Sequence, residues 1–563
     1  MLWLSLLACK PEPVVCTSTE LAFDDDPSEH LGAWPDDRYT VEASSPTGRV
    51  IDLSQAGWVD DQASLIQDLF LQSEGKSGFA TVGEVLLRFT GPLPKADAGV
   101  ALYELGANGP VLVPTEARLA DDDTDLYLRP LRPLATGTEH MALVTHEAAG
   151  SDRCIAPGPQ LSQDLDEGRH DATLQALELT VADVGALTTF TTHADHQPFL
   201  DAADAAYPVA GWGPLDCFEE HGLNRCETTF EPQDFREPGG VVVDSAQGSH
   251  VVPVTWWLPE GPPGKVVMLG HGLNGGRDAS HIRQVAERLV PLGFACVATD
   301  ALAHNDHPTA TGGGAMDFLG LDIAAFRFDG SKTQSNFQQS ILERHQLLKL
   351  LKQDADLDGD GVDDVDADRI AYLGISLGAL LGTGLLAVND DIEAATLPVG
   401  GGDLISIVRD SEVMEDVLPL LTNLAGNQAD LDAYLAAMQT IVDPADPALW
   451  GTYVLDEAAP DLLFQVALHD QVVPPSAGRA LARGFGIPQV GVVEQPVAPL
   501  TEQPGYPVQG NHASGATVGM VQFDMLDGRP AVHDDAGHPL VIGQSLAFLE
   551  SWGAGQTVIS APE

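Results

Sequence analysis

The stretch that decides the fold is Arg369-Ile370-Ala371-Tyr372-Leu373-Gly374-Ile375-Ser376-Leu377-Gly378-Ala379-Leu380-Leu381. Its first half is an apolar run typical of a strand, and its second half, rich in leucine and small residues, is typical of a helix. Between them, Gly374 and Gly378 flank Ser376 in a G-x-S-x-G pattern, which predicts a sharp strand–turn–helix connection. Glycine at both positions avoids side chains that would clash in so tight a turn. Because the N–H groups of the following helix would face a developing oxyanion, Ser376 is the candidate nucleophile.

A serine nucleophile needs a base, and an acid that orients the base. After an elbow of this kind, the acid precedes the histidine in the chain. Asp470 directly follows the apolar strand expected over 461–468, so it is the candidate acid. Two histidines, His533 and His538, lie between the last expected strand, 519–526, and the final helix. We predict that His533 is the base, because His538 stands where that helix begins; His538 is the alternative.

Two backbone N–H groups are expected to hold the oxyanion. One belongs to Leu377, directly after the nucleophile. The other is expected in the loop after the third strand of the sheet, where residues 269–276 are Leu-Gly-His-Gly-Leu-Asn-Gly-Gly. The likeness of this loop to the oxyanion loop of lipases and esterases implies that the N–H of Leu273 is the second donor. His271 is then expected to brace the turn, and it is not a candidate base.

Residues 354–366 form an acidic loop with carboxylates on alternate residues. Counted from Asp356, a glycine occupies the sixth place, as in loops that wrap a hard cation with oxygen ligands. The twelfth place is Ala367 where an EF-hand has glutamate, so this is not an EF-hand. The loop resembles the short aspartate-rich calcium loops of secreted bacterial proteins, and the alternative is a solvated acidic loop. The predicted ligands of a structural calcium ion are Asp356, Asp358, Asp360 and Asp364.

The chain has 563 residues, which is too many for one hydrophobic core, so more than one domain is expected. Its formal net charge is −56, because 83 Asp and Glu residues outnumber 27 Lys and Arg residues. Such a surface repels phosphate groups, so we expect no nucleic-acid partner and no direct attraction to anionic membranes. The acidic excess fits either solubility in salty or extracellular surroundings or cation binding.

The N-terminal Leu6-Leu7-Ala8-Cys9 resembles a bacterial lipobox, in which the cysteine is lipidated after cleavage. The apolar region before it is short, and no basic residue precedes it, so a chance hydrophobic N-terminus is the alternative. We predict export, either as an outer-membrane or cell-surface lipoprotein anchored through Cys9 or as a secreted protein. Contact with a membrane would then occur through the lipid anchor.

The other cysteines fit an exported protein. Cys217 and Cys226 are close together in a polar segment, where we predict a disulfide. Cys16 and Cys154 could tie the N-terminal arm to the first domain. Cys296 lies in an apolar strand and is expected to be a buried free thiol.

The order of expected elements divides the chain into three parts. Residues 1–38 are predicted to be a lipoprotein signal followed by a flexible tether, because residues from about 10 to 38 are polar and proline-bearing. Residues 39–237 contain short strands at regular spacing, which indicate a β-sandwich-like domain with a helical extension. Residues 238–563 alternate strands and helices, which predicts a doubly wound, mostly parallel sheet. Within it, the helical stretch at about 403–450 is expected to form a cap over the serine, or else to bury itself against the core.

Taken together, the elbow, His271-Gly272, Asp470 and His533 make residues from about 238 to 555 resemble an α/β-hydrolase. The lipobox, the immunoglobulin-like N-terminal half and the aspartate loop resemble the bacterial secreted or surface lipases known as virulence-factor-type lipases. That resemblance implies a lipase or carboxylesterase acting on acyl esters, including lysophospholipids, with no cofactor needed for catalysis. The alternatives are a serine peptidase or amidase of the same fold and a non-catalytic surface binding protein.

Overall fold

The computed structural model describes residues 21–26, 31–60, 62–96, 98–120, 123–150, 153–238, 240–322, 325, 327–415, 417–455 and 459–563. The predicted lipidation site, Cys9, and the predicted disulfide partner of Cys154, Cys16, lie outside these residues. Across the described ranges, no helix combines the length and the apolar character needed to cross a membrane.

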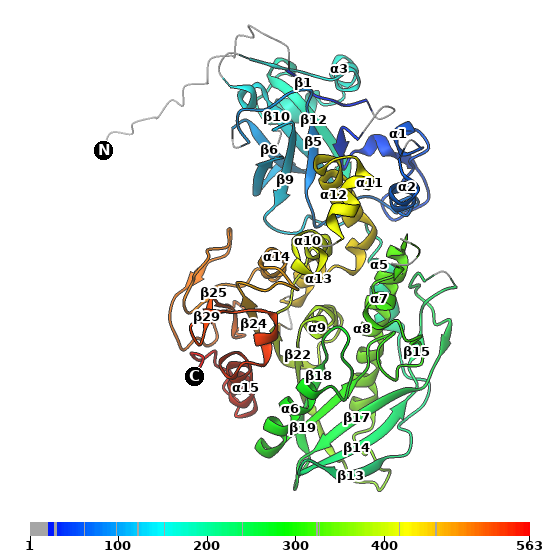
Figure 1. Ribbon diagram of the computed structural model, residues 1–563, viewed down its shortest axis with the longest axis vertical. Helices are drawn as coiled ribbons and strands as arrows, with labels where there is room; N and C mark the ends of the chain where they lie inside the picture. The colour runs from blue at the N-terminus through cyan, green and yellow to red at the C-terminus, as the bar shows by residue number, and fades with distance from the viewer. Residues whose placement is uncertain are drawn as a thin grey trace.

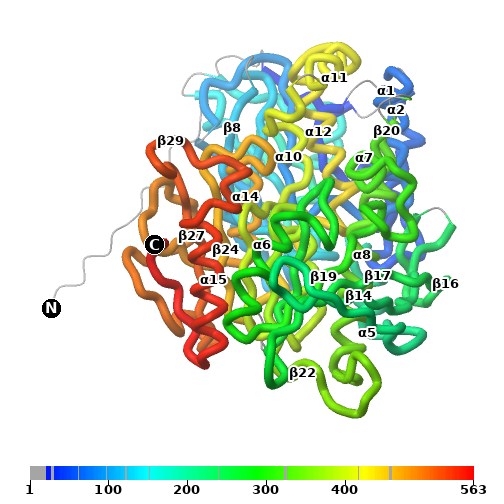
Figure 2. Tube along the Cα trace, turned by 60° about the horizontal axis from the view of Figure 1, so that its bottom comes forward, coloured from blue at the N-terminus to red at the C-terminus, as the bar shows by residue number. Residues whose placement is uncertain are grey.

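The centre of the molecule is an eleven-stranded sheet (Figures 1 and 2). Figure 2 shows it spreading from β27 and β24 in orange and red to β17 and β14 in green. In spatial order its strands are β13 (Asp216–Glu220), β14 (Leu223–Phe230), β17 (Val252–Leu258), β19 (Phe294–Thr299), β18 (Gly264–Gly270), β22 (Val365–Gly374), β23 (Ile392–Pro398), β24 (Asp461–Ala467), β27 (Val518–Phe523), β25 (Gln489–Val490) and β26 (Glu502–Gln503).

The pairing confirms a doubly wound, mostly parallel sheet. The strands from β19 to β26 pair in parallel, and β13, β14 and β17 add an antiparallel edge. The order reverses at β18, which lies between β19 and β22. The carboxyl ends of β18, β22, β24 and β27 therefore lie along one edge of the sheet, where ligands bind in open α/β sheets.

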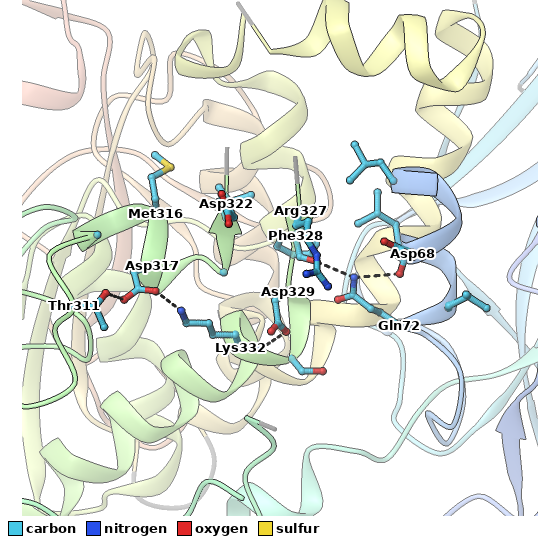
Figure 3. Close-up of a pocket in the computed structure, with 17 residues that line it drawn as sticks. Asp68, Gln72, Thr311, Met316, Asp317, Asp322, Arg327, Phe328, Asp329 and Lys332 are labelled. Atoms are coloured by element: carbon cyan, nitrogen blue, oxygen red, sulfur yellow. Dashed lines mark hydrogen bonds and ion pairs between the residues drawn. The ribbon is translucent and has the colours of Figure 1, made fainter. Parts of the chain in front are cut away.

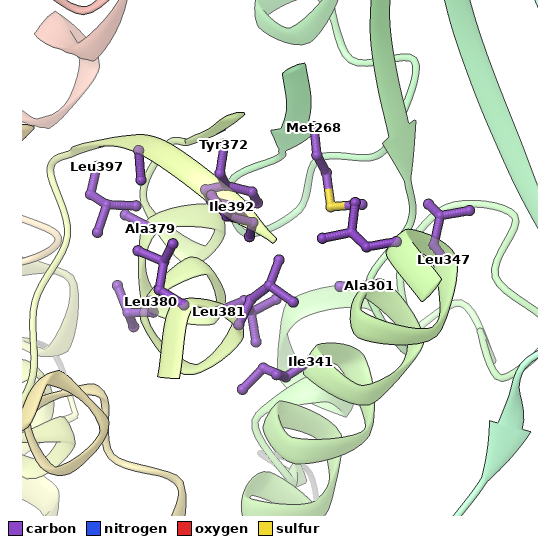
Figure 4. Packing of buried hydrophobic residues seen from close by; sticks show 14 of the residues in the cluster. Met268, Ala301, Ile341, Leu347, Tyr372, Ala379, Leu380, Leu381, Ile392 and Leu397 are labelled. Atoms are coloured by element: carbon purple, nitrogen blue, oxygen red, sulfur yellow. The ribbon is translucent and has the colours of Figure 1, made fainter. Parts of the chain in front are cut away.

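Helices cover both faces of the sheet because the central strands are apolar on both sides. On β18, Val266 and Met268 point to the face covered by α8 (Gly330–Gln353) and α9 (Leu377–Val388). Val267 and Leu269 point to the opposite face, covered by α6 (Ser280–Leu289) and α15 (Pro539–Gly553). Figure 4 shows the first core, where Met268 and Tyr372 meet the leucines of α9 and the apolar side of α8.

The N-terminal part contains two four-stranded antiparallel sheets. Apolar side chains of both sheets belong to one buried cluster, separate from those of the central sheet. The predicted immunoglobulin-like assignment remains a prediction. One sheet consists of β2 (Ala33–Trp34), β5 (Val85–Arg88), β9 (Asp125–Pro130) and β8 (Thr115–Leu119), and the other of β12 (Val184–Thr191), β10 (Glu139–Thr145), β6 (Val100–Gly106) and β7 (Gly109–Val113).

Two predicted boundaries are wrong in detail. Residues 31–38 are not a tether, because Trp34 is buried in the N-terminal core and β2 pairs with β5. Residue 237 does not separate the two parts, because β13 and β14 precede it and belong to the central sheet. From Asn224 to Phe230, β14 pairs with β17, so the sheet continues across the predicted boundary.

The cysteines follow the prediction where the structure describes them. Cys217 and Cys226 face each other across the β13–β14 hairpin and form a disulfide. Cys296 is a buried free cysteine in β19, and burial raises the pKa of its thiol.

The predicted insertion between β23 and β24 is helical, with α10 (Leu404–Asp410), α11 (Leu418–Ala425), α12 (Gln428–Val442) and α13 (Pro447–Val454). Its apolar residues do not form a separate cap. Leu431 and Leu435 of α12 belong to the core of the N-terminal part. Both overall views show α11 and α12 against the blue N-terminal segments (Figures 1 and 2). The described apolar residues of the insertion are therefore buried against the protein's cores, as in the second interpretation, and in doing so they join the two parts of the chain.

Asp443, at the end of α12, is the polar centre of this junction. Its buried carboxylate accepts hydrogen bonds from Thr81 N (2.8 Å), Val82 N (3.0 Å) and His193 Nε2 (2.8 Å). Gln439 of α12 donates a further hydrogen bond at 3.0 Å. Burial alone would raise the pKa of Asp443, but the imidazole of His193 and the Thr81 donors lower it below its ordinary value.

We predict that Asp443→Ala lowers the free energy of unfolding by about 3–5 kcal/mol at pH 7, because it leaves buried donors without their acceptor. Since the folded pKa of Asp443 is lowered, its contribution is present above the ordinary aspartate pKa of about 3.9 and is lost as the pH falls further. Denaturant unfolding of both proteins at several pH values measures this difference. Glu550→Ala on the exposed side of α15 is the control, with an expected change within about 0.5 kcal/mol. An equal change in both variants would contradict the prediction.

Candidate active site

The elbow places Ser376 at the junction of β22 and α9 in a left-handed backbone conformation, with φ of 57°. Both predicted glycines are required by close backbone contacts. A Cβ on Gly374 would lie 2.3 Å from the carbonyl oxygen of Gly378, and a Cβ on Gly378 would lie 2.3 Å from that of Gly270. The backbone N–H of Ser376 donates to Pro398 O at 3.1 Å, which ties the turn to the neighbouring strand β23. The serine is therefore held rigidly at the carboxyl edge of the sheet.

The structure brings Ser376, His533 and Asp470 together in one hydrogen-bonded chain. Ser376 Oγ lies 3.0 Å from His533 Nε2, and His533 Nδ1 lies 2.8 Å from Asp470 Oδ2. The other carboxylate oxygen of Asp470 accepts hydrogen bonds from the N–H groups of Val472 and Val473, both at 2.8 Å. With Nδ1 protonated, the imidazole donates to Asp470 and leaves Nε2 to accept the serine proton.

The alternative base, His538, has a different place. It caps α15, where its ring accepts from Leu540 N, and its Nε2 lies 3.0 Å from Asp527 Oδ2. His533 begins the short helix η7 (His533–Gly537), between the β28–β29 hairpin (Met525–Leu526 and Arg529–Pro530) and α15. Both histidines lie in the same segment of the chain. In the structure, the Ser376 hydroxyl is within hydrogen-bonding distance of His533, whereas His538 contacts Asp527.

An ion pair that the sequence did not predict, between Arg529 and Asp535, stabilises the loop that contains His533. Asp535 is buried and accepts two hydrogen bonds from the Arg529 guanidinium, at 2.6 and 2.8 Å. It also accepts one from Val532 N at 2.8 Å. The Arg529 partner lowers the pKa of the Asp535 carboxyl. Arg529 and Asp535 lie on either side of His533 in the sequence, and this spacing could have predicted the ion pair.

The loop after β18 lies against the serine, as predicted. A Cβ on Gly272 would lie 3.9 Å from Ser376 Oγ, so the backbone before Leu273 passes directly beside the hydroxyl. On the other side, Leu377 is the first residue of α9, and its N–H has no acceptor within the helix. The two predicted oxyanion donors thus come from segments that flank the Ser376 hydroxyl.

His271 braces this loop and is not a base. Its Nδ1 donates to Gly272 O at 2.9 Å, and its Nε2 accepts from Ala301 N at 2.9 Å. Burial lowers the pKa of His271 well below its ordinary value, so the ring is neutral and ties the loop to the segment after β19.

Two hollows lie near these loops. One, of about 540 Å³, borders the acid and base loops and is lined by Asp470, Gln471, Arg529 and Val532 among others. The larger, of about 820 Å³, lies between α2 (Ser64–Leu71), α7 (Gly314–Phe318) and the start of α8 (Figure 3). Helix α7, which lines this hollow, contacts the oxyanion loop, because Ala315 N donates to Asn274 Oδ1 at 3.2 Å.

The lining of the larger hollow combines charged and apolar side chains. Figure 3 shows Asp317 between Thr311 and Lys332, with Met316 above Asp317 and Phe328 farther to the right. This hollow has no residue of the Ser376–His533–Asp470 set in its wall.

The aspartate loop brings three of its four predicted ligands together. Carboxylate oxygens of Asp356, Asp358 and Asp364 lie within 4.8 Å of one another. Asp360 is outside this group, and its carboxylate accepts from Val362 N at 2.9 Å. Asp356 accepts from the N–H groups of Gly359 and Gly361, so the loop wraps around this carboxylate.

Comparison with known proteins finds distant structural likeness and no close relative. No protein family and no curated protein matches the chain. An acetyl xylan esterase from Thermoanaerobacterium sp. shares 15% identity with a TM-score of 0.39, over 60% of this chain and 89% of that one. A cold-adapted esterase from an Arctic intertidal metagenomic library shares 17% identity with a TM-score of 0.35, over 61% and 99%. An acylaminoacyl peptidase from Pyrococcus horikoshii shares 11% identity with a TM-score of 0.35, over 60% and 49%. These likenesses are too distant to carry an argument about activity.

We predict that His533→Ala slows the reaction of Ser376 with a fluorophosphonate probe by about 10²–10⁴-fold, because the serine loses the group that accepts its proton. His538→Ala, the matched control, should leave this rate nearly unchanged, since His538 contacts Asp527 and the start of α15. Labelling followed over time by intact-mass spectrometry measures both rates. The opposite ranking would assign the base to His538.

Proposed function

We propose that this protein is a serine hydrolase of carboxylic esters that works by acyl transfer. One observation carries the proposal: Ser376 Oγ, His533 and Asp470 form a continuous hydrogen-bonded chain, with distances of 3.0 and 2.8 Å, at the carboxyl edge of the sheet. The strained elbow that presents the serine and the glycine loop beside it support the same chemistry.

In the first step, His533 Nε2 takes the proton of Ser376 as Oγ attacks the ester carbonyl carbon. The carbonyl oxygen gains the negative charge, and the N–H groups of Leu273 and Leu377 are the proposed donors to it. Asp470 stabilises the imidazolium that forms. When the tetrahedral intermediate collapses, the bond to the alcohol oxygen breaks, and His533 gives its proton to the leaving alcohol.

In the second step, water enters the place of the alcohol. His533 takes a proton from the water, whose oxygen attacks the acyl carbon. Collapse of the second intermediate breaks the bond to Ser376 Oγ, releases the carboxylic acid, and returns the proton to Ser376. The three side chains are then in their starting protonation states, and the proposed reaction uses no cofactor.

The substrates proposed are lipase or carboxylesterase substrates, with acyl lipids and lysophospholipids the first to test. The proposed location is outside the cytoplasm, as a secreted protein or a lipoprotein anchored through Cys9. The Cys217–Cys226 disulfide supports this location, because disulfides persist in oxidising compartments. The net charge of −56 supports a substrate other than nucleic acid.

We predict that Ser376→Ala lowers ester hydrolysis by about 10⁴-fold or more while leaving the fold intact, because no other group can form the acyl-enzyme. A panel of acyl esters of increasing chain length, lysophospholipids and peptide amides measures the activity, and circular dichroism checks the fold. Faster turnover of the amides would favour a peptidase or amidase. Failure of the wild-type protein to react with any substrate or with a fluorophosphonate would favour a binding protein.

We also propose that the aspartate loop holds a structural calcium ion, since its clustered carboxylates repel one another without a cation. We predict that calcium at about 100 times its Kd stabilises the protein by about 2.7 kcal/mol. The double variant Asp356→Asn, Asp358→Asn should lose this effect and keep its esterase activity below the unfolding temperature. Thermal unfolding with and without calcium measures it. An equal response of the double variant would contradict calcium binding in this loop.

A further inference from the structure

A second group of metal-binding side chains lies away from Ser376, in the half of the sheet that contains β17. His250 Nε2 is 2.8 Å from Glu343 Oε1, and His307 Nε2 is 3.0 Å from Glu343 Oε2. The two imidazole rings have their centroids 5.1 Å apart. The nitrogen and oxygen atoms that these three residues offer all lie within 4.8 Å of one another.

These residues come from three separate segments. His250 lies between β16 (Gly248–Ser249) and β17, His307 lies in the loop after β19, and Glu343 lies in the middle of α8. The carboxylate of Glu343 is fully buried, the side chain of His307 is also buried, and that of His250 is 15% exposed. These three side chains are therefore closed to solvent toward the core and accessible to solvent at His250.

The two imidazoles are the ionisable partners of the buried Glu343 carboxylate. Among the described ion pairs, Glu343 contacts the two histidines and neither a lysine nor an arginine. Gln339 adds a hydrogen bond to its Oε1 at 3.4 Å. Because the Glu343 carboxylate is fully buried, a positive charge shared with the two imidazoles, from a proton or from a divalent cation, would neutralise it.

The Nδ1 atom of each imidazole faces a polar group that can orient the ring. His307 Nδ1 lies 2.7 Å from Thr309 Oγ1 and accepts a hydrogen bond from Thr309 N at 3.2 Å, and His250 Nδ1 lies 3.8 Å from the Asp234 carboxylate. In metal-binding histidines the second ring nitrogen commonly donates to a carboxylate or hydroxyl while Nε2 holds the metal, and Asp234 and Thr309 Oγ1 are the acceptors available here to Nδ1 of His250 and of His307. Asp234 is itself fixed by Arg236, whose guanidinium lies 2.7 Å from Asp234 Oδ2.

We propose that His250, His307 and Glu343 form a binding site for a divalent transition metal ion, with zinc as its probe. Two imidazoles and one carboxylate are ligands that zinc accepts, at bond lengths of about 2.0–2.2 Å. Ligand atoms of a tetrahedral centre then stand about 3.3 Å apart, so the present separations of 2.8 and 3.0 Å need to open by a few tenths of an ångström. The fourth position, toward the partly exposed His250, is left for water.

The place of this site gives it a structural role. The loop that carries His307 also carries Ala301, whose N–H donates to His271 of the oxyanion loop. At the start of the same loop, Asp300 accepts from Arg277 N at 2.7 Å. A metal ion would join this loop to α8 and to the beginning of β17, and so support the loop beside Ser376. Metal binding itself does not depend on the proposed ester hydrolysis.

The test is the metal content of the full chain, produced without a histidine tag, exposed to zinc and then dialysed. We expect one zinc ion per wild-type chain by plasma mass spectrometry. His307→Gln and Glu343→Gln should bind zinc at least about 100-fold more weakly, and Asp234→Asn about 10–100-fold more weakly. Replacing zinc with cobalt should give the visible absorption of a four-coordinate ion in the wild type and not in Glu343→Gln.

The matched control is His193→Gln, which removes another buried histidine that contacts a carboxylate, here Asp443, and that belongs to no group of three metal-binding side chains among the described residues. It should retain wild-type zinc, as should the calcium-loop variant Asp356→Asn. Glu343→Gln preserves size and helix, and near-ultraviolet circular dichroism shows that each variant is folded. Two results would overturn the proposal: a folded wild-type chain that binds no zinc, or a Glu343→Gln variant that binds as much zinc as the wild type. The three residues would then be a carboxylate hydrogen-bonded by two histidines.

Discussion

The proposed active site depends on the close contact of two backbones where β22 turns into α9. Gly378 packs against Gly270 at the end of β18, and a methyl group on either residue would collide with its neighbours. Tyr372 secures the turn, because its hydroxyl donates to Gly378 O at 2.6 Å. This contact brings the first turn of α9 and the loop after β18 together on both sides of Ser376. A serine with positive φ is tolerated there because the surrounding structure determines its conformation.

The other two members of the hydrogen-bonded chain are placed by the same sheet. Asp470 follows β24, and His533 follows the segment after β27, so both arrive at the edge that holds the elbow. Each loop is then fixed by its own hydrogen bonds. Two backbone N–H groups orient the carboxylate of Asp470, and the Arg529–Asp535 pair holds the turn that carries His533. Rigid strands and hydrogen-bonded loops give the precise positions that the proposed acyl transfer requires.

The N-terminal part and the central sheet are joined by the helical insertion. Helix α12 leaves the central fold and completes the core of the N-terminal part, and the buried Asp443 hydrogen-bonds to residues of that part. The insertion thus contributes to the stability of both parts.

The sequence by itself determined the doubly wound sheet, the elbow and the candidates Ser376, Asp470 and His533, because each follows from local patterns of glycine, apolar runs and strand ends. It also indicated the Cys217–Cys226 pair, which spans one short hairpin. Contacts between distant segments were decided by the tertiary structure: the hydrogen bond that separates His533 from His538, the pairing of β14 with β17, the packing of α12 on the N-terminal core, and the meeting of His250, His307 and Glu343. Such contacts leave no period or spacing in the chain, since they depend on which buried surfaces fit together in space.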